Sequence, residues 1–149
     1  MEIPSFREDG WLPEGHHPAS WNHIEEVLAG TEGSRRRLLY DRLVAWRESL
    51  RAHRVFGLLV LDGSFVSAKG APGDIDAIFV YDVGSVESLA GDEEAARLLN
   101  YVSLKDSGLG DIFCFAETAV RNFPSMCRLD GFDVDRHTGL PKGVLEVRI

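Results

Sequence analysis

The chain has 149 residues and a formal net charge of −8, with 44% hydrophobic and 27% charged residues. This length and composition are typical of one folded domain, which excludes a chain that is disordered throughout. The longest apolar run is far shorter than the ~20 residues of a membrane-spanning helix, and the acidic balance argues against a protein that coats nucleic acid. Because residues 1–10 are polar and acidic rather than a secretory leader, we expect a single cytoplasmic domain over residues 1–149.

Helical patterns are expected over residues 20–54, after an irregular N-terminal arm. Residues 1–19 are rich in Pro, Gly and His and show no hydrophobic period. Ser20 is a plausible N-cap for a short helix over residues 20–28, and Ser34 for a long helix over residues 35–51. In the long helix, apolar side chains recur at helical spacing, and two more widen the stripe. The stripe is Leu39, Leu43, Trp46 and Leu50, widened by Leu38 and Ala45.

Strand patterns are expected to build the core of residues 55–149. Residues 55–61 (VFGLLVL) form a short apolar run typical of a buried strand. Residues 74–81 (DIDAIFVY) begin with an alternation that puts Asp74 and Asp76 on one face of a strand. Further along, the patterns predict an acidic helix over 87–99, a strand over 111–115, and a terminal hairpin of 132–135 with 144–149. Because helices and strands are interleaved, the sequence predicts an α+β fold, a small mixed β-sheet with helices packed on it.

The stretch GSFVSAKGAPGDID, residues 63–76, carries the most chemistry. Gly63 and Ser64 follow a buried strand directly, where a glycine lets the backbone approach a phosphate and a serine hydroxyl can donate to it. Asp74 and Asp76 are separated by one residue, so their side chains leave the same face of the next strand, about 6.6 Å apart along it. A divalent cation would relieve the repulsion between them, and Mg²⁺ is held by carboxylates together with substrate phosphates. The stretch therefore outlines a nucleotide–metal site.

Gly-Ser followed by Asp-hydrophobic-Asp at the start of a strand resembles the signature of the polymerase-beta-type nucleotidyltransferase superfamily, and of its minimal bacterial members above all. That motif covers residues 58–80. The strings GSFVSAK, DIDA and GLPKGVLEV also resemble a small family of uncharacterised bacterial nucleotidyltransferase-like proteins, over most of the chain. Some of those proteins are encoded near toxin–antitoxin modules. The resemblance implies a nucleotidyltransferase-like fold.

The resemblance also implies a third carboxylate on a neighbouring strand, which joins Asp74 and Asp76 in holding a catalytic Mg²⁺ or Mn²⁺. Asp111, at the head of the predicted strand over 111–115, is the first candidate, and Glu117 is the second. Gly63 and Ser64 would then bind the triphosphate. Lys69, between this cradle and the carboxylates, could neutralise a phosphate oxygen. Lys142 in GLPKG is a weaker candidate.

Seven arginines lie within residues 34–54, and Arg35, Arg36 and Arg37 fall in the first turn of the predicted long helix. Positive charge there opposes the helix macrodipole, at about 0.3–1 kcal/mol each. The run would either bind an anion, such as an RNA or a nucleotide phosphate, or form a solvated surface. We favour the solvated surface.

Two functions from different classes remain open. The first is a Mg²⁺-dependent nucleotidyltransferase that transfers a nucleoside monophosphate from an NTP to a hydroxyl of a protein or an RNA. The second is a nucleotidyltransferase-like protein with weak or no activity that binds a partner in the manner of an antitoxin. The expected partners are therefore an NTP, a protein or RNA acceptor, and a cognate toxin or antitoxin or a second copy of the chain.

Overall fold

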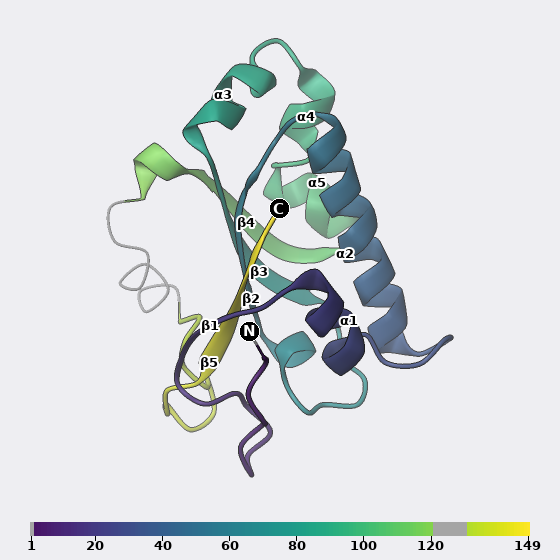
Figure 1. Cartoon of the computed structure of the whole chain (residues 1–149), viewed down its shortest axis with the longest axis vertical. Helices are drawn as coiled ribbons and strands as arrows, with labels where there is room; N and C mark the ends of the chain where they lie inside the picture. The colour runs from purple at the N-terminus through teal and green to yellow at the C-terminus, as the bar shows by residue number, and fades with distance from the viewer. Residues whose placement is uncertain (1, 121–130) are drawn as a thin grey trace.

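A five-stranded mixed β-sheet forms the centre of the part of the chain that the structure, a computed structural model, describes: residues 2–120 and 131–149 (Figure 1). The strand order is β1-β5-β2-β3-β4. β1 runs parallel to β5 and β4 parallel to β3, whereas β2 is antiparallel to both of its neighbours. The strands are β1 (Gly15–Pro18), β2 (Gly57–Asp62), β3 (Ile75–Tyr81), β4 (Gly110–Ala116) and β5 (Gly143–Arg148). The fold is thus α+β with a mixed sheet, as the sequence predicts.

The helices gather mainly along one side of the sheet, where the longest of them, α2, lies (Figure 1). They are α1 (Trp21–Leu28), α2 (Arg35–Ala52), α3 (Val83–Leu89), α4 (Glu93–Arg97) and α5 (Tyr101–Asp106), with the 3₁₀ turns η1 (Ser64–Val66) and η2 (Glu117–Ala119). Both predicted N-caps are confirmed, because the Ser20 side chain accepts from the backbone N–H of His23 and the Ser34 side chain from that of Arg37. Within the described residues, no helix has both the length and the apolar character needed to cross a bilayer.

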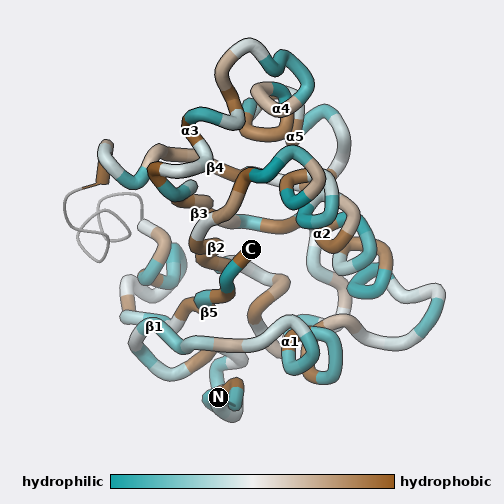
Figure 2. The backbone as a smooth tube through the Cα atoms, turned by 45° about the horizontal axis from the view of Figure 1, so that its top comes forward, coloured by the Kyte–Doolittle hydropathy of each residue, from teal (hydrophilic) through white to brown (hydrophobic). Residues whose placement is uncertain are grey.

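The main core lies between α2 and one face of the sheet. The predicted stripe of α2 is buried there with alternate residues of β3, namely Leu39, Leu43, Trp46 and Leu50 with Ile75, Ala77 and Phe79. The prediction that Leu38 and Ala45 widen this stripe is wrong, since both are exposed. They lie about 100–120° around the helix from the stripe at 3.6 residues per turn, and Tyr40 on the opposite flank is buried instead. In Figure 2 the hydrophobic residues concentrate along the central strands and hydrophilic ones along the outer side of α2.

The N-terminal arm is more ordered than its composition suggests. The expectation of an irregular segment over residues 1–19 is wrong for β1, which adds an edge strand beside β5. Leu12, just before β1, is fully buried, and its carbonyl accepts from the backbone N–H of Gly143. A four-residue strand with two histidines and a proline has too little hydrophobic pattern to be found from sequence, because partner pairing rather than side-chain burial defines it.

Two further predictions for the second half of the chain are wrong. The single helix over 87–99 is divided into α3 and α4 around Gly91, whose φ of +73° cannot continue a right-handed helix; α5 was not predicted. The terminal hairpin does not form, since β5 pairs with β2 and β1. The segment near residue 134 instead pairs with the chain before β5 through the isolated bridge between Val134 and Pro141.

Candidate functional site

A row of three aspartates crosses the sheet on the face opposite α2. Asp76 of β3 is the register partner of Asp62 on β2 and of Asp111 on β4. Since side chains alternate along a strand and Ile75 and Ala77 enter the main core, Asp76 and its two partners leave the other face. Directly opposite residues on neighbouring strands bring their Cβ atoms to about 5 Å, so like charges there repel one another. The fold therefore concentrates negative charge at this level of the sheet.

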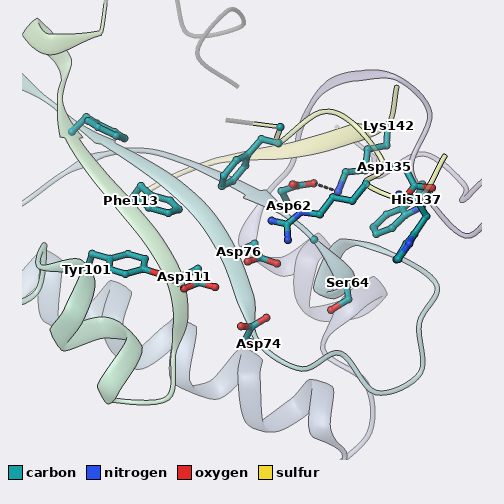
Figure 3. Close-up of a pocket in the computed structure, with 16 residues that line it drawn as sticks. Asp62, Ser64, Asp74, Asp76, Tyr101, Asp111, Phe113, Asp135, His137 and Lys142 are labelled. Atoms are coloured by element: carbon teal, nitrogen blue, oxygen red, sulfur yellow. Dashed lines mark hydrogen bonds and ion pairs between the residues drawn. The ribbon is translucent and has the colours of Figure 1, made fainter. Parts of the chain in front are cut away.

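Asp74, Asp76 and Asp111 come together as one cluster (Figure 3). Each offers one carboxylate oxygen, and these three oxygens all lie within 4.8 Å of one another. Opposite ligands of Mg²⁺ stand about 4.2 Å apart at bond lengths of 2.0–2.1 Å, so small side-chain rotations would bring the oxygens onto one ion. Hard carboxylate oxygens also suit Mn²⁺. The structure thus brings together the three residues that the sequence nominates as metal ligands.

The middle carboxylate of the row is the most perturbed. Burial, followed by the charges of Asp74, Asp62 and Asp111, raises the pKa of Asp76 to about 6. A carboxylate whose ionised form is this unfavourable gains most from a bound cation, which removes the repulsion. The carboxylates therefore repel one another at the place where a bound metal ion would reduce the repulsion.

The two ends of the row are held by lysines. At one end, Lys142 lies 2.9 Å from Asp62, and only 5% of each residue is exposed. The Lys142 ammonium also lies over the ring of Trp11, 4.2 Å from its centroid. At the other end, the Asp111 Oδ1 atom accepts from Tyr101 Oη at 2.5 Å and Lys105 Nζ at 3.0 Å.

These contacts separate the roles of the two end carboxylates. Burial raises the pKa of Asp62, against the opposing charge of Lys142, and the pair neutralises itself within the protein. The hydrogen bond from Tyr101, followed by that from Lys105, lowers the pKa of Asp111. Asp111 is thereby kept ionised, and because these bonds engage its Oδ1 atom, they also orient its carboxylate.

Gly63 is required by the carboxylate cluster itself. Its φ is +73°, and a Cβ added there would lie 2.1 Å from the Oδ2 atom of Asp76. Only glycine both adopts this backbone conformation and leaves room for the carboxylate. The next residue, Ser64, begins η1 and faces the aspartates across the pocket (Figure 3). Gly63 thus couples the Gly-Ser turn to the metal-ligand candidates in space as well as in sequence.

The loop that follows Ser64 is fastened to α2 by Arg36. Its guanidinium donates to the carbonyl of Phe65 at 2.7 Å, to that of Ser67 at 2.5 Å and to that of Lys69. Arg35 donates to the carbonyl of Gly73 in the same loop, and burial lowers the pKa of Arg36. The expectation of a solvated arginine surface is therefore wrong for Arg36, whose guanidinium binds the carbonyls of residues 65–69, whereas Arg35 is exposed to solvent.

The aspartates, Gly63 and Ser64 line a pocket of about 650 Å³. One wall carries the aspartates, and Gly63 and Ser64 lie between it and a facing wall with cationic side chains (Figure 3). The facing wall comprises Trp11, Asp135, Arg136, His137 and Lys142, and an aromatic side is formed by Tyr101, Phe113, Phe115 and Phe132. Negative, positive and aromatic surfaces therefore meet in one concave space, which is the usual setting of a ligand site.

Of the residues nominated from sequence, most line this pocket and two do not. Asp74, Asp76, Asp111, Gly63, Ser64 and Lys142 all do. Lys69 is exposed and contributes its backbone carbonyl to Arg36 instead. Glu117, the second choice for a third carboxylate, lies in η2 and accepts from the backbone N–H of Val83.

The family of unknown function DUF6932 matches residues 4–148. The chain belongs to this family. No curated protein and no solved structure matches it. Every residue that lines the pocket falls inside the matched range of DUF6932. The description of the family carries no activity, so the nucleotidyltransferase resemblance stays a prediction.

Sequence reasoning missed several residues of this DUF6932 site. Asp62 immediately precedes Gly63, and its position at the end of an apolar strand was a usable signal. Tyr101 was not found because α5 was not predicted, and its contact with Asp111 depends on how α5 packs against β4. Trp11 lies in the arm that appeared irregular, and its bridge with Ser67 and the pairing of β1 with β5 bring it to the pocket.

Proposed function

We propose that this protein is a Mg²⁺-dependent nucleotidyltransferase that transfers a nucleoside monophosphate from an NTP to an acceptor hydroxyl. The observation that carries the proposal is the cluster of Asp74, Asp76 and Asp111, whose carboxylate oxygens lie within 4.8 Å of one another. Across the same pocket lies Ser64, next to the glycine that makes room for Asp76. A divalent cation on carboxylates beside a phosphate-binding turn is the arrangement that phosphoryl transfer needs.

The walls of the pocket suit a triphosphate. Ser64 would donate to a phosphate oxygen, and the basic side chain of Arg136 on the facing wall would offset part of the phosphate charge. Lys142 reaches the pocket only as a partner of Asp62, so its role is to keep that wall from being net negative. When bound, Mg²⁺ would stabilise the negative charge that develops on the transferring phosphate and the leaving oxygen.

The reaction would form a bond from the acceptor oxygen to the α-phosphorus and break the bond from that phosphorus to the bridging oxygen. Pyrophosphate would leave with that oxygen, and the proton of the acceptor hydroxyl would pass to the Asp111 carboxylate and from there to water. Asp111 is placed to accept a hydrogen bond from the acceptor hydroxyl, because Tyr101 and Lys105 hold it ionised through its Oδ1 atom. In this scheme Asp74, Asp76 and Asp111 hold the cation, and Asp111 also orients the nucleophile.

The test compares the wild-type protein with Asp74→Asn/Asp76→Asn. Calorimetry with Mg²⁺ or Mn²⁺ and ATP, followed by incubation with α-labelled NTPs in lysate, should show metal-dependent binding and label transfer in the wild type only. Asp41→Asn/Asp106→Asn is the matched control, since it removes two exposed aspartates outside the pocket and changes the charge equally. Equal labelling by the wild type and the Asp74/Asp76 variant would refute the proposal.

A partner-binding role without catalysis is the second candidate. Its favouring observation is a group of exposed apolar side chains near α3, namely Phe56, Val83 and Val86, which are 41–54% exposed. The Ser85 hydroxyl accepts from the backbone N–H of Phe56 and donates to the Phe56 carbonyl, and these two bonds hold Phe56 next to α3. An antitoxin-like complex would survive Asp74→Asn/Asp76→Asn and be lost on Val83→Asp/Val86→Asp. The reverse pattern would favour catalysis.

A further inference from the structure

We propose that the aromatic side of the pocket is a stacking subsite for a nucleobase, centred on Phe113 of β4. The inference rests on the proposed function, because it assigns the base of a nucleotide or of an RNA end to the surface beside the phosphate and metal site. Its support comes from ring geometry and exposure, which are independent of the carboxylate cluster.

The rings form a row that comes from three separate elements. Tyr101 of α5 stacks on Phe113, with ring centroids 4.9 Å apart and planes at 19°. Phe132 meets Phe113 edge to face, with ring centroids 6.4 Å apart and an interplanar angle of 75°. All three rings line the pocket. A row of rings that are already ordered presents flat apolar surface at little further entropic cost.

Phe113 is 38% exposed although it lies in a strand of the central sheet. It follows Asp111 by two residues on β4, so both side chains leave the same face about 6.6 Å apart along the strand. The exposed ring therefore lies directly beside the third carboxylate of the cluster, as Figure 3 shows. A ligand with a phosphate at the aspartates would extend its remaining part over this ring.

A nucleobase fits this surface better than an aliphatic group does. Bases stack on Phe and Tyr rings through their flat faces and keep their polar edges in contact with water or polar groups. Here the rings are bordered by polar groups, because the Tyr101 hydroxyl and the Lys105 ammonium both lie at Asp111. An aliphatic ligand would gain nothing from that polar border.

The experiment measures binding of Mg²⁺–ATP, Mg²⁺–tripolyphosphate and adenosine to wild type, Phe113→Leu and Phe113→Tyr. Phe113→Leu should weaken ATP and adenosine binding by roughly 5- to 100-fold, the range for loss of one base–aromatic stack. Binding of tripolyphosphate, which has no base, should be unchanged. Phe113→Tyr keeps the ring and should bind like the wild type. If Phe113→Leu is unstable, the comparison of ATP with tripolyphosphate on the wild-type protein still tests the subsite.

Phe56→Leu is the matched control, because Phe56 is 41% exposed and lies outside the pocket lining. Competition of adenosine with ATP and with a tetra-adenylate RNA distinguishes a subsite for the free nucleotide from one for an RNA end. If ATP binds no more tightly than tripolyphosphate, or if Phe113→Leu leaves both ATP and adenosine binding unchanged, the subsite is refuted while the metal–phosphate site stands. If adenosine binding depends on Phe113 but tripolyphosphate does not bind, the subsite stands and the proposed function fails.

Discussion

Asp76 of β3 and Asp111 of β4 lie directly opposite each other in a parallel strand pair. Their separation is fixed by strand register, so it depends on the whole sheet rather than on the flexibility of a loop. A second partner, Asp62, lies opposite Asp76 on the antiparallel side. The central carboxylate is therefore flanked by acids from both neighbouring strands. This relationship sets the electrostatics of the pocket and leads to four predictions.

Metal binding should weaken as the pH falls through about 6. The proton and the cation compete for Asp76, whose pKa is raised to about 6. At pH 5, about one unit below that pKa, the affinity for Mg²⁺ or Mn²⁺ should be roughly ten-fold lower than at pH 7.5. Calorimetry at several pH values measures this slope. An affinity that is constant from pH 7.5 to 5 would contradict the assignment of Asp76 as a ligand.

Asp76→Asn should abolish metal binding and yet stabilise the metal-free protein. The pKa of Asp76 is raised from 3.8 to about 6 on folding, so the native state binds more protons between these values and the free energy of unfolding falls as the pH rises through them. Asparagine carries no charge and escapes this loss. We expect a gain of about 1–2 kcal/mol at pH 7, discounted for solvent around a half-buried carboxylate, and a much smaller gain near pH 4. Urea unfolding at both pH values checks this, with Asp106→Asn as an exposed control.

Tyr101→Phe should weaken metal binding without loosening the aromatic row. The substitution removes the hydroxyl that donates to Asp111 and keeps the ring stacked on Phe113. The pKa of Asp111 should rise toward its usual value, and Mg²⁺ affinity should fall by about ten-fold, as for other groups that orient metal ligands. Carboxyl-carbon NMR titration and calorimetry measure the two effects. Tyr40→Phe, away from the pocket, should change neither, and an unchanged Asp111 titration in Tyr101→Phe would show that the hydrogen bond has no such role.

Lys142→Met should destabilise the protein far more than a surface substitution does. It leaves Asp62 buried without its ion-pair partner, and breaking a buried pair costs about 3–5 kcal/mol. Adding Asp62→Asn should recover part of this loss, which a double-mutant cycle from urea unfolding would measure. Additive losses in the double variant would show that the two side chains are not coupled.

The sequence predicted the parts of this site that follow from local pattern. The alternation in DIDAIFVY placed Asp74 and Asp76 on one face of a strand, and that face is the pocket face. Asp111 was chosen as the head of the next strand, and the parallel pairing of β3 and β4 brings it opposite Asp76. The first inference needed only strand periodicity, whereas the expectation of a third carboxylate on a neighbouring strand came from the resemblance to the nucleotidyltransferase superfamily.

What the sequence could not predict depends on contacts between distant segments. Lys142 contacts both the ring of Trp11 and the carboxylate of Asp62, and the pairing of β1 with β5 brings the two segments together. That pairing is not visible in a local sequence pattern. Lys69 looked suitable from its position in the turn, but the Arg36 guanidinium holds the backbone of that loop and its side chain does not line the pocket. The use of an arginine to bind carbonyls cannot be distinguished in sequence from an arginine that binds phosphate.

The carbonyl contacts of Arg36 have a wider consequence. The turn that contains Ser64 is fastened to α2, whereas Asp76 lies in the strand that α2 packs against and Asp74 directly precedes that strand. The spacing between the serine and the aspartates is thus set by how closely helix and sheet fit together. Substitutions in that interface, such as at Leu43 or Phe79, would change the geometry of a site that they do not touch. Ligand affinity would then report on core packing.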